Sequence, residues 1–272
     1  MTALPDTAHL TRLALRVRDI DRMLAYYVGV LGLVEVGKSG SLITLAPSDE
    51  LFHLDLVHEP DAPLRPYPCP GLYHFAIVVP DRPALGRIFR HLIELKEPFE
   101  GMADHLVSEG LYIRDPELNG IELYRDRPKD EWQHLPDGSL RLVSDPIDAD
   151  GILASAEGPS PLDAGTRFGH IHLHVSDIDE AAAFFGKTLG LNRMAEIPGA
   201  LFYAAGDYHH HVGVNTWAPD HPAPENATGL LSYTFRVPKE WAGPDELTDP
   251  TGASVRFEPG IGQVMIAHSP SP

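Results

Sequence analysis

Histidines and one glutamate alternate with apolar residues in three short segments of this 272-residue chain. Successive side chains of a strand point to opposite faces, so His74 in YHFAIVV points away from Phe75. Glu122 has the same alternating setting in NGIELY. The segment GHIHLHV places three histidines on a single face: His170, His172 and His174. Imidazole and carboxylate groups together bind transition metals, so metal binding is the first chemistry that this pattern indicates.

Each of these residues also has an ordinary explanation. A single histidine on a strand is more often exposed, or hydrogen-bonded in a core, than bound to metal. A carboxylate between two apolar residues, such as Glu122, can face solvent on a one-sided sheet. A fourth segment, DYHHHVGVNTW, enlarges the group, and strand alternation there would place His209 and His211 on one face and His210 on the other. The clustering of these residues supports the metal-site hypothesis more than any one of them does.

An internal repeat distributes these residues among related units. LRVRDIDRMLAYYVGVLGL, which begins at Leu15, returns 158 residues later as LHVSDIDEAAAFFGKTLGL, which begins at Leu173. The same offset places Arg12 opposite His170, and His74 opposite Ser232. One copy of each pair therefore keeps an imidazole that the other copy lacks.

The first two units are each predicted to contain a strand, a helix and two or three further strands. Apolar residues alternate over 13–17, Asp19 follows where a helix N-cap is expected, and Gly32 ends the helix. The second unit begins at Tyr73 and continues with a helix predicted over 83–95. It closes with two strands joined at DPELNG, whose residues are typical of a hairpin turn.

The last two units complete an α+β fold of repeated βαβββ modules. The third begins at His170 and the fourth at Ser232, but the offset from the second to the fourth falls from 158 to 134, so about 24 residues, the length of a helix and its connections, are absent. We predict a first domain at 8–126 with two modules, a linker at 127–166, and a second domain at 167–262 with one full and one truncated module.

Composition excludes several classes of partner. The chain carries 39 acidic and 21 basic residues, and the resulting net charge of −18 repels nucleic acid and anionic membranes. Cys69 is the single cysteine, and no basic segment followed by an apolar run opens the chain, so a cytoplasmic protein without internal disulfides is expected. No glycine-rich nucleotide-binding loop is present. A homodimer is the commonest assembly for such a chain.

Four segments resemble a known group of proteins. Paired βαβββ units with a histidine in a first strand and a glutamate in a last strand are similar to the vicinal oxygen chelate superfamily, which includes glyoxalase I and type I extradiol dioxygenases. The resemblance is closer to the catechol 2,3-dioxygenase branch, whose signature segments are matched in order, over residues from about 9 to 235, by LYHFAIVVPDR, DHLVSEGLYIRDPELNGIELYRDRP, GHIHLHVSDI and YHHHVGVNTW. It implies that the modules form paired half-barrels.

The resemblance also implies a metal site. Extradiol dioxygenases hold Fe(II), with Mn(II) as an alternative, through two histidines and one glutamate, and leave positions for a catechol and for dioxygen. Carried over by motif, the ligands are His74, Glu122 and His170. The corresponding first-strand residues of the other units are Arg12 and Ser232, which are not plausible ligands. We therefore expect units two and three to pair around the metal, and units one and four to form a metal-free half.

Three further residues receive roles from the same segments. Tyr112, ten residues before Glu122, is expected to donate a hydrogen bond to the substrate oxygen, although a core tyrosine with a satisfied hydroxyl is the plain alternative. His105, in the DHLVSEG loop, is expected to act as the acid or base that handles the catechol proton, unless it is simply solvated. His211 is expected to orient oxygen or substrate.

The function implied by the resemblance is metal-dependent extradiol cleavage of a catechol-type ring with O2. Two alternatives remain. A glyoxalase-like isomerase or lyase would use four protein ligands, and HHHVGVNTW offers no carboxylate. A non-catalytic small-molecule-binding member of the superfamily would need no metal site at all, which the joint presence of His74, Glu122 and His170 disfavours.

Overall fold

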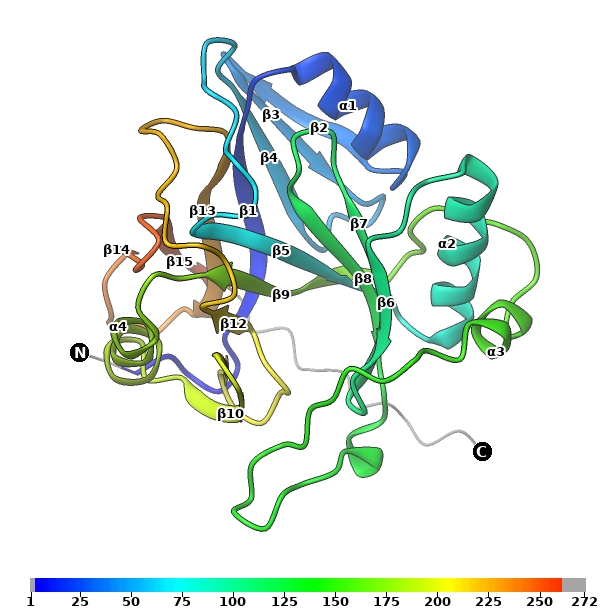
Figure 1. The fold of residues 1–272 in the computed structure, drawn as a ribbon. Coiled ribbons are helices and arrows are strands. Elements are labelled where there is room, and N and C mark those ends of the chain that lie inside the picture. The colour runs from blue at the N-terminus through cyan, green and yellow to red at the C-terminus, as the bar shows by residue number, and fades with distance from the viewer. Residues whose placement is uncertain (1–2, 261–272) are drawn as a thin grey trace.

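Two β-sheets dominate the computed structural model of this chain, which describes residues 3–260 (Figure 1). Modules of one strand, one helix and three strands build both sheets. The first module contains β1 (His9–Val17), α1 (Ile20–Gly29), β2 (Val34–Ser39), β3 (Leu42–Ala46) and β4 (His53–His58). The second contains β5 (Gly71–Val78), α2 (Arg82–Leu95), β6 (Gly101–Asp104), β7 (Ser108–Arg114) and β8 (Gly120–Asp126). The predicted βαβββ plan is confirmed in both.

The second half of the chain repeats this plan once in full and once in part. The third module contains β9 (Arg167–His174), α4 (Ile178–Ala182), the π-helix η2 (Ala183–Thr188), β10 (Asn192–Ile197), β11 (Ala200–Ala204) and β12 (Val212–Asn215). The fourth contains only β13 (Gly229–Pro238), β14 (Glu246–Thr248) and β15 (Ser254–Gly260). Between modules two and three lie the 3₁₀ turn η1 (Lys129–Glu131) and the short helix α3 (Ala149–Ala154). The predicted truncation of the fourth module is confirmed, because no helix joins its described strands.

Aspartates cap the first turns of α1, α2 and α4, and the first of them, Asp19, is the N-cap that the sequence predicts. Asp19 accepts a hydrogen bond from the backbone N–H of Arg22 at 3.1 Å, and Asp81 accepts one from the N–H of Ala84 at 2.7 Å. Asp177 caps α4 in the same way. Such caps satisfy backbone donors that the first turn of a helix leaves free, which is why these helices begin directly after the first strand of each module.

The modules pair into two sheets in the way that the positions of the histidines predicted. One sheet has eight strands in the order β10-β11-β12-β9-β5-β8-β7-β6, and the other has seven in the order β14-β15-β13-β1-β4-β3-β2. Modules two and three therefore share one sheet, and modules one and four share the other, as we expected. Each sheet takes strands from both sides of the linker at 127–166. The domain boundaries stay a prediction, and residues 261 and 262 lie outside the described part of the chain.

The two half-barrels place equivalent residues at equivalent positions. In the eight-stranded sheet, Ala76 of β5 pairs with both His170 of β9 and Glu122 of β8. In the seven-stranded sheet, Ala14 of β1 pairs with both Ser232 and Asp55. Arg12 and His74 each stand two residues before the paired alanine.

An ion pair occupies the metal-free half at the place of the histidine and glutamate. The guanidinium Nη1 of Arg12 lies 2.9 and 2.8 Å from the two carboxylate oxygens of Asp55, which also accepts a hydrogen bond from Thr44. A buried carboxylate is stable only with such partners. The repeat has therefore preserved the backbone geometry in both halves, while the polar side chains have diverged.

Strand alternation separates the core from the face that carries the histidines. Phe75 is buried against Phe168, with ring centroids 5.8 Å apart, and Phe168 contacts Phe52 of the other sheet at 5.8 Å. The two sheets thus share one hydrophobic core. His74, the neighbour of Phe75, consequently points to the opposite face. No helix within residues 3–260 has the length and apolar character needed to cross a membrane.

Candidate metal centre and cavity

Three adjacent strands bring His74, Glu122 and His170 together. Strand β5 lies between β9 and β8, so a residue on one face of β5 has neighbours on both sides. The Nε2 atoms of His74 and His170 lie 3.2 and 3.0 Å from the same carboxylate oxygen, Oε2 of Glu122. One nitrogen from each histidine and one oxygen from the glutamate all lie within 4.8 Å of one another. The structure therefore groups the three residues that the sequence marks as ligands.

The chemistry of these three side chains fits a metal ion. All three are buried, with 2 to 5% of their surface exposed. Within residues 3–260, Nδ1 of His74 and Nδ1 of His170 have no hydrogen-bond partner, and Nε2 of His74 approaches Oε2 of Glu122 without the geometry of a hydrogen bond. Buried polar atoms without partners are costly, and a cation among the three side chains would satisfy Nε2 of His74. Two imidazoles and one carboxylate on one side of an ion form the facial triad of non-haem metal sites.

The protonation states also suit a metal. Burial alone would raise the pKa of Glu122, but the adjacent imidazoles of His170 and His74 bring its pKa well below the usual range. Burial lowers the pKa of His170 to about 4, against the opposing influence of Glu122. Glu122 is therefore ionised and His170 neutral near pH 7, and both are the forms that bind cations.

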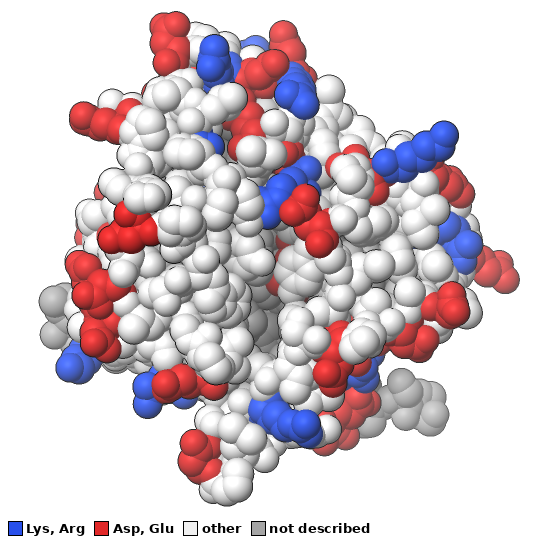
Figure 2. Space-filling model, in the orientation of Figure 1, with Lys and Arg blue, Asp and Glu red and all other residues white. Residues whose placement is uncertain are grey.

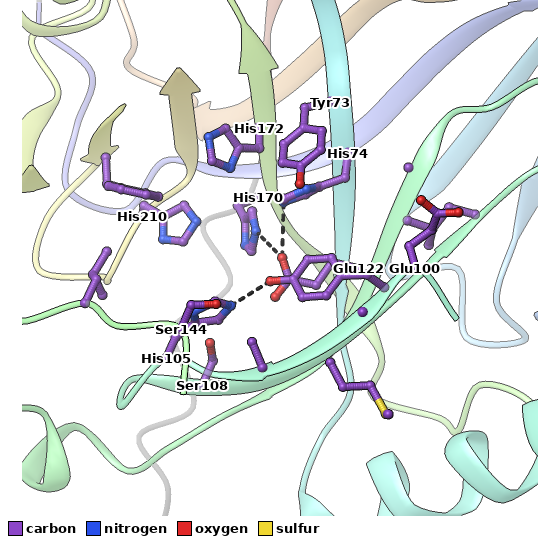
Figure 3. A pocket seen from close by; sticks show the side chains of 18 of the residues that line it. Tyr73, His74, Glu100, His105, Ser108, Glu122, Ser144, His170, His172 and His210 are labelled. Atoms are coloured by element: carbon purple, nitrogen blue, oxygen red, sulfur yellow. Dashed lines mark hydrogen bonds and ion pairs between the residues drawn. The ribbon is translucent and has the colours of Figure 1, made fainter. Parts of the chain in front are cut away.

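A cavity of about 560 Å³ opens above the three side chains. Figure 3 shows His74, Glu122 and His170 converging at its base, with His172 and His210 on neighbouring strands and loops. The walls are rich in aromatic rings, which come from Tyr67, Tyr73, Phe202 and Trp217. On the face drawn in Figure 2 the surface is hollowed near its centre, and acidic and basic side chains are scattered around it. This is a site for a small, flat molecule rather than for a polymer.

Tyr112 and His105 form a hydrogen-bonded pair on the cavity wall. Nδ1 of His105 lies 2.6 Å from the backbone oxygen of Val143, which can only accept, so Nδ1 carries the proton. With this one ring proton on Nδ1, Nε2 of His105 accepts from the hydroxyl of Tyr112, also at 2.6 Å. Burial, followed by the charge of Glu122, raises the pKa of Tyr112 well above its usual range, so this hydroxyl stays protonated. Both residues line the cavity.

His211 lies elsewhere. We expected strand alternation through residues 209–215, but β12 begins only at Val212, and the segment before it is a turn. Nδ1 of His211 accepts from the backbone N–H of Ala205 at 3.2 Å, and its ring packs near Phe235 of the other sheet. His211 is not among the cavity-lining residues, so the expected role in orienting oxygen or substrate does not fit its position.

His210 takes the place expected for His211. Its ring lines the cavity and lies 4.1 Å, centroid to centroid, from the ring of His170 (Figure 3). Burial and the surrounding imidazoles lower the pKa of His210 well below the usual range, so its ring is neutral. Strand alternation could not choose between His210 and His211, because both residues lie before β12 begins.

Two more features of the site had weak or no sequence signals. His172 lines the cavity, and its Nε2 lies 2.9 Å from the amide nitrogen of Asn215, whose side chain oxygen binds Nδ1 of His174 at 2.6 Å. The shared face of GHIHLHV indicated these histidines but not their asparagine partner. The segment 142–144 of the predicted surface linker forms another wall, which includes the carbonyl that binds His105.

Comparisons with known proteins agree with this fold. Residues 9–123 match the Glyoxalase/Bleomycin resistance protein/Dioxygenase superfamily. A protein of Bacillus subtilis (strain 168) named Catechol-2,3-dioxygenase is 40% identical over 247 residues, which cover 88% of this chain and 86% of that protein. This chain therefore belongs to the glyoxalase/bleomycin resistance/dioxygenase superfamily.

Solved structures support the fold alone. A Bacillus subtilis structure covers 94% of this chain and 86% of its own, with a TM-score of 0.65 and 12% identity. Glyoxalase I from Zea mays covers 92% of each chain, with a TM-score of 0.55 and 16% identity. At these identities, the shared property is the arrangement of modules.

Proposed function

We propose that this protein is an extradiol dioxygenase that cleaves a catechol-type aromatic ring with O2 at an Fe(II) centre. The observation that carries the proposal is the buried group of His74, Glu122 and His170 at the base of an aromatic-lined cavity. The relative named Catechol-2,3-dioxygenase supports the same reaction class. A bound Fe(II) would supply a redox-active centre at which the diol and dioxygen come together.

The residues around the centre have separable tasks in this proposal. His74, Glu122 and His170 hold the metal. The hydroxyl of Tyr112 donates its one proton to Nε2 of His105, so it can accept a hydrogen bond from a substrate hydroxyl, and the pair can take up that proton and later return it. The carbonyl of Val143 keeps His105 in the tautomer that this transfer requires. The aromatic walls orient a flat ring and exclude water.

The number of protein ligands favours ring cleavage over an isomerase or lyase of the glyoxalase kind. The position in module three that corresponds to Glu122 is Gly213, because Gly213 pairs with His172 as Glu122 pairs with Ala76 in β5. A carboxylate at that position would complete a four-ligand site. Glycine leaves room that the ring of His172 fills, since a Cβ there would lie 3.0 Å from that ring. A three-ligand site keeps coordination positions for both substrates.

The test is anaerobic reconstitution with Fe(II), followed by addition of catechol and then air. The yellow colour of a ring-cleaved hydroxymuconic semialdehyde near neutral pH supports the proposal. His74→Ala should abolish the colour, and His174→Gln is the matched control, since it changes a histidine of the same sheet face that is hydrogen-bonded to Asn215. Colour from H74A, or tight binding of Fe(II) by the wild-type protein without oxygen uptake on any catechol, would overturn the proposal.

A further inference from the structure

A chain of hydrogen bonds leads from the cavity to a carboxylate at its edge. Nδ1 of His210 lies 2.7 Å from Nδ1 of His209, and Nε2 of His209 lies 2.9 Å from Oδ1 of Asp126. The side chain of His209 is fully buried, whereas 22% of the side chain of Asp126 is exposed. Neither His209 nor Asp126 is among the residues that line the cavity.

The donors and acceptors in this chain fix one another. A carboxylate can only accept, so Nε2 of His209 carries the proton that it donates to Asp126. In the form of His209 with this one ring proton, Nδ1 is an acceptor, and the proton of the contact between the two histidines belongs to Nδ1 of His210. Neutral His210 has only one ring proton, so its Nε2 has none.

We infer that Asp126 and His209 are positioning residues that hold His210 in the tautomer whose Nε2 offers a lone pair to the cavity. This nitrogen then accepts a hydrogen bond from an acidic hydroxyl of a bound ligand, such as a phenolic O–H, and does not compete as a donor. The arrangement of carboxylate, imidazole and acting group follows the logic of a catalytic triad, in which the distal acid sets the tautomer. Its consequence for catalysis rests on the proposed function.

Two tyrosines hold Asp126 in place. The hydroxyl of Tyr208 donates to Asp126, at 3.1 Å from Oδ2, and accepts from the hydroxyl of Tyr124 at 2.6 Å. The ring of Tyr208 also lies 4.1 Å, centroid to centroid, from that of His209. The turn before β12 thus places Tyr208, His209 and His210 in one hydrogen-bonded network, and Asp126, at the end of this network, accepts from both Tyr208 and His209.

Nitrogen-15 NMR of the metal-free protein, prepared with a chelator, measures the tautomer directly. We expect the His210 signals, identified by their loss in His210→Gln, to show a protonated Nδ1 and an unprotonated Nε2. Asp126→Ala should leave His209 without its acceptor, so that His210 populates both tautomers. Tyr208→Phe is the matched control: it removes a hydrogen bond to the same carboxylate but keeps His209 anchored. A proton on Nε2 of wild-type His210 would overturn the inference, even if the alanine variant does not fold.

Activity separates positioning from a merely structural role. With Fe(II) and catechol, D126A should lower kcat roughly 100-fold, the usual scale for a misplaced proton acceptor, while KM and Mn(II) affinity stay at their wild-type values. Y208F should keep kcat within a few-fold. Equal tautomer populations in D126A and wild type would refute the positioning role. If wild type shows the expected tautomer but cleaves no catechol, the tautomer assignment stands and the ring-cleavage proposal fails.

Discussion

His211 should contribute to stability rather than to catalysis, and the contribution should depend on pH. Burial lowers the pKa of this imidazole to about 3, because its ring is enclosed between the two sheets and near other histidines. Among residues 3–260, the only hydrogen bond of the ring is the one that Nδ1 accepts from the N–H of Ala205. An asparagine can place its side chain oxygen near the position of that nitrogen, so His211→Asn should keep the hydrogen bond and remove the titration.

The sign and size follow from linkage. The pKa of this group is lower in the folded state than in the unfolded chain, where a histidine titrates near 6.5, so the unfolded chain binds more protons between these values. The stability contribution is complete above about pH 6.5 and is lost as the pH falls toward 3. At pH 5 the loss amounts to roughly 2 kcal/mol, since one pH unit corresponds to about 1.4 kcal/mol for one proton.

Urea unfolding of the metal-free protein at pH 8 and pH 5 measures this effect. The wild-type protein should lose about 2 kcal/mol more than H211N between the two pH values. His134→Asn, which changes an exposed histidine, should behave like the wild type. Equal losses in wild type and H211N would refute the argument, and a large fall in kcat for H211N at pH 8 would return His211 to the active site.

Three further predictions concern the equivalence of the two half-barrels, the role of Tyr112 and the close packing at Gly120. A triple variant should bind two Mn(II) ions per chain in equilibrium dialysis where the wild type binds one: Arg12→His, Asp55→Glu and Ser232→His. These positions repeat the register of the metal ligands. A single bound ion would contradict the equivalence of the two halves. Tyr112→Phe should lower kcat roughly 100-fold with Mn(II) affinity retained, and unchanged kcat would remove the tyrosine from the mechanism. Gly120→Ala should destabilise the protein by about 2 kcal/mol in urea, since its Cβ would lie 2.3 Å from a backbone oxygen of β5; wild-type stability would show that the strands can separate there.

Part of the ligand set could be predicted from local rules. Alternation along a strand separates His74, Glu122 and His170 from their apolar neighbours, and the resemblance of their segments to extradiol dioxygenases is what selected these three as ligands. The internal repeat supplied the long-range part of the prediction. Arg12 and Ser232, at the matching positions of the other units, indicated which modules share a metal and which do not.

The remainder of the site depends on features that alternation does not describe. A turn at Gly206 and Asp207 delays β12 to Val212, so residues 209–211 lie before the strand and do not alternate between its faces. This is why His210, and not His211, reaches the cavity. The carbonyl of Val143 belongs to a linker with no periodic pattern. Every residue has a backbone carbonyl, so the residue type at 143 could not predict the contact with His105.

The anomalous scattering of a crystal loaded with Mn(II) tests the metal centre most directly. We expect a single strong peak at the base of the cavity, bonded to Nε2 of His74, Nε2 of His170 and a carboxylate oxygen of Glu122, and its disappearance in crystals of E122A. A peak bonded to other residues, or no peak at this position at a Mn(II) concentration that saturates the protein in solution, would contradict the assignment of the metal centre.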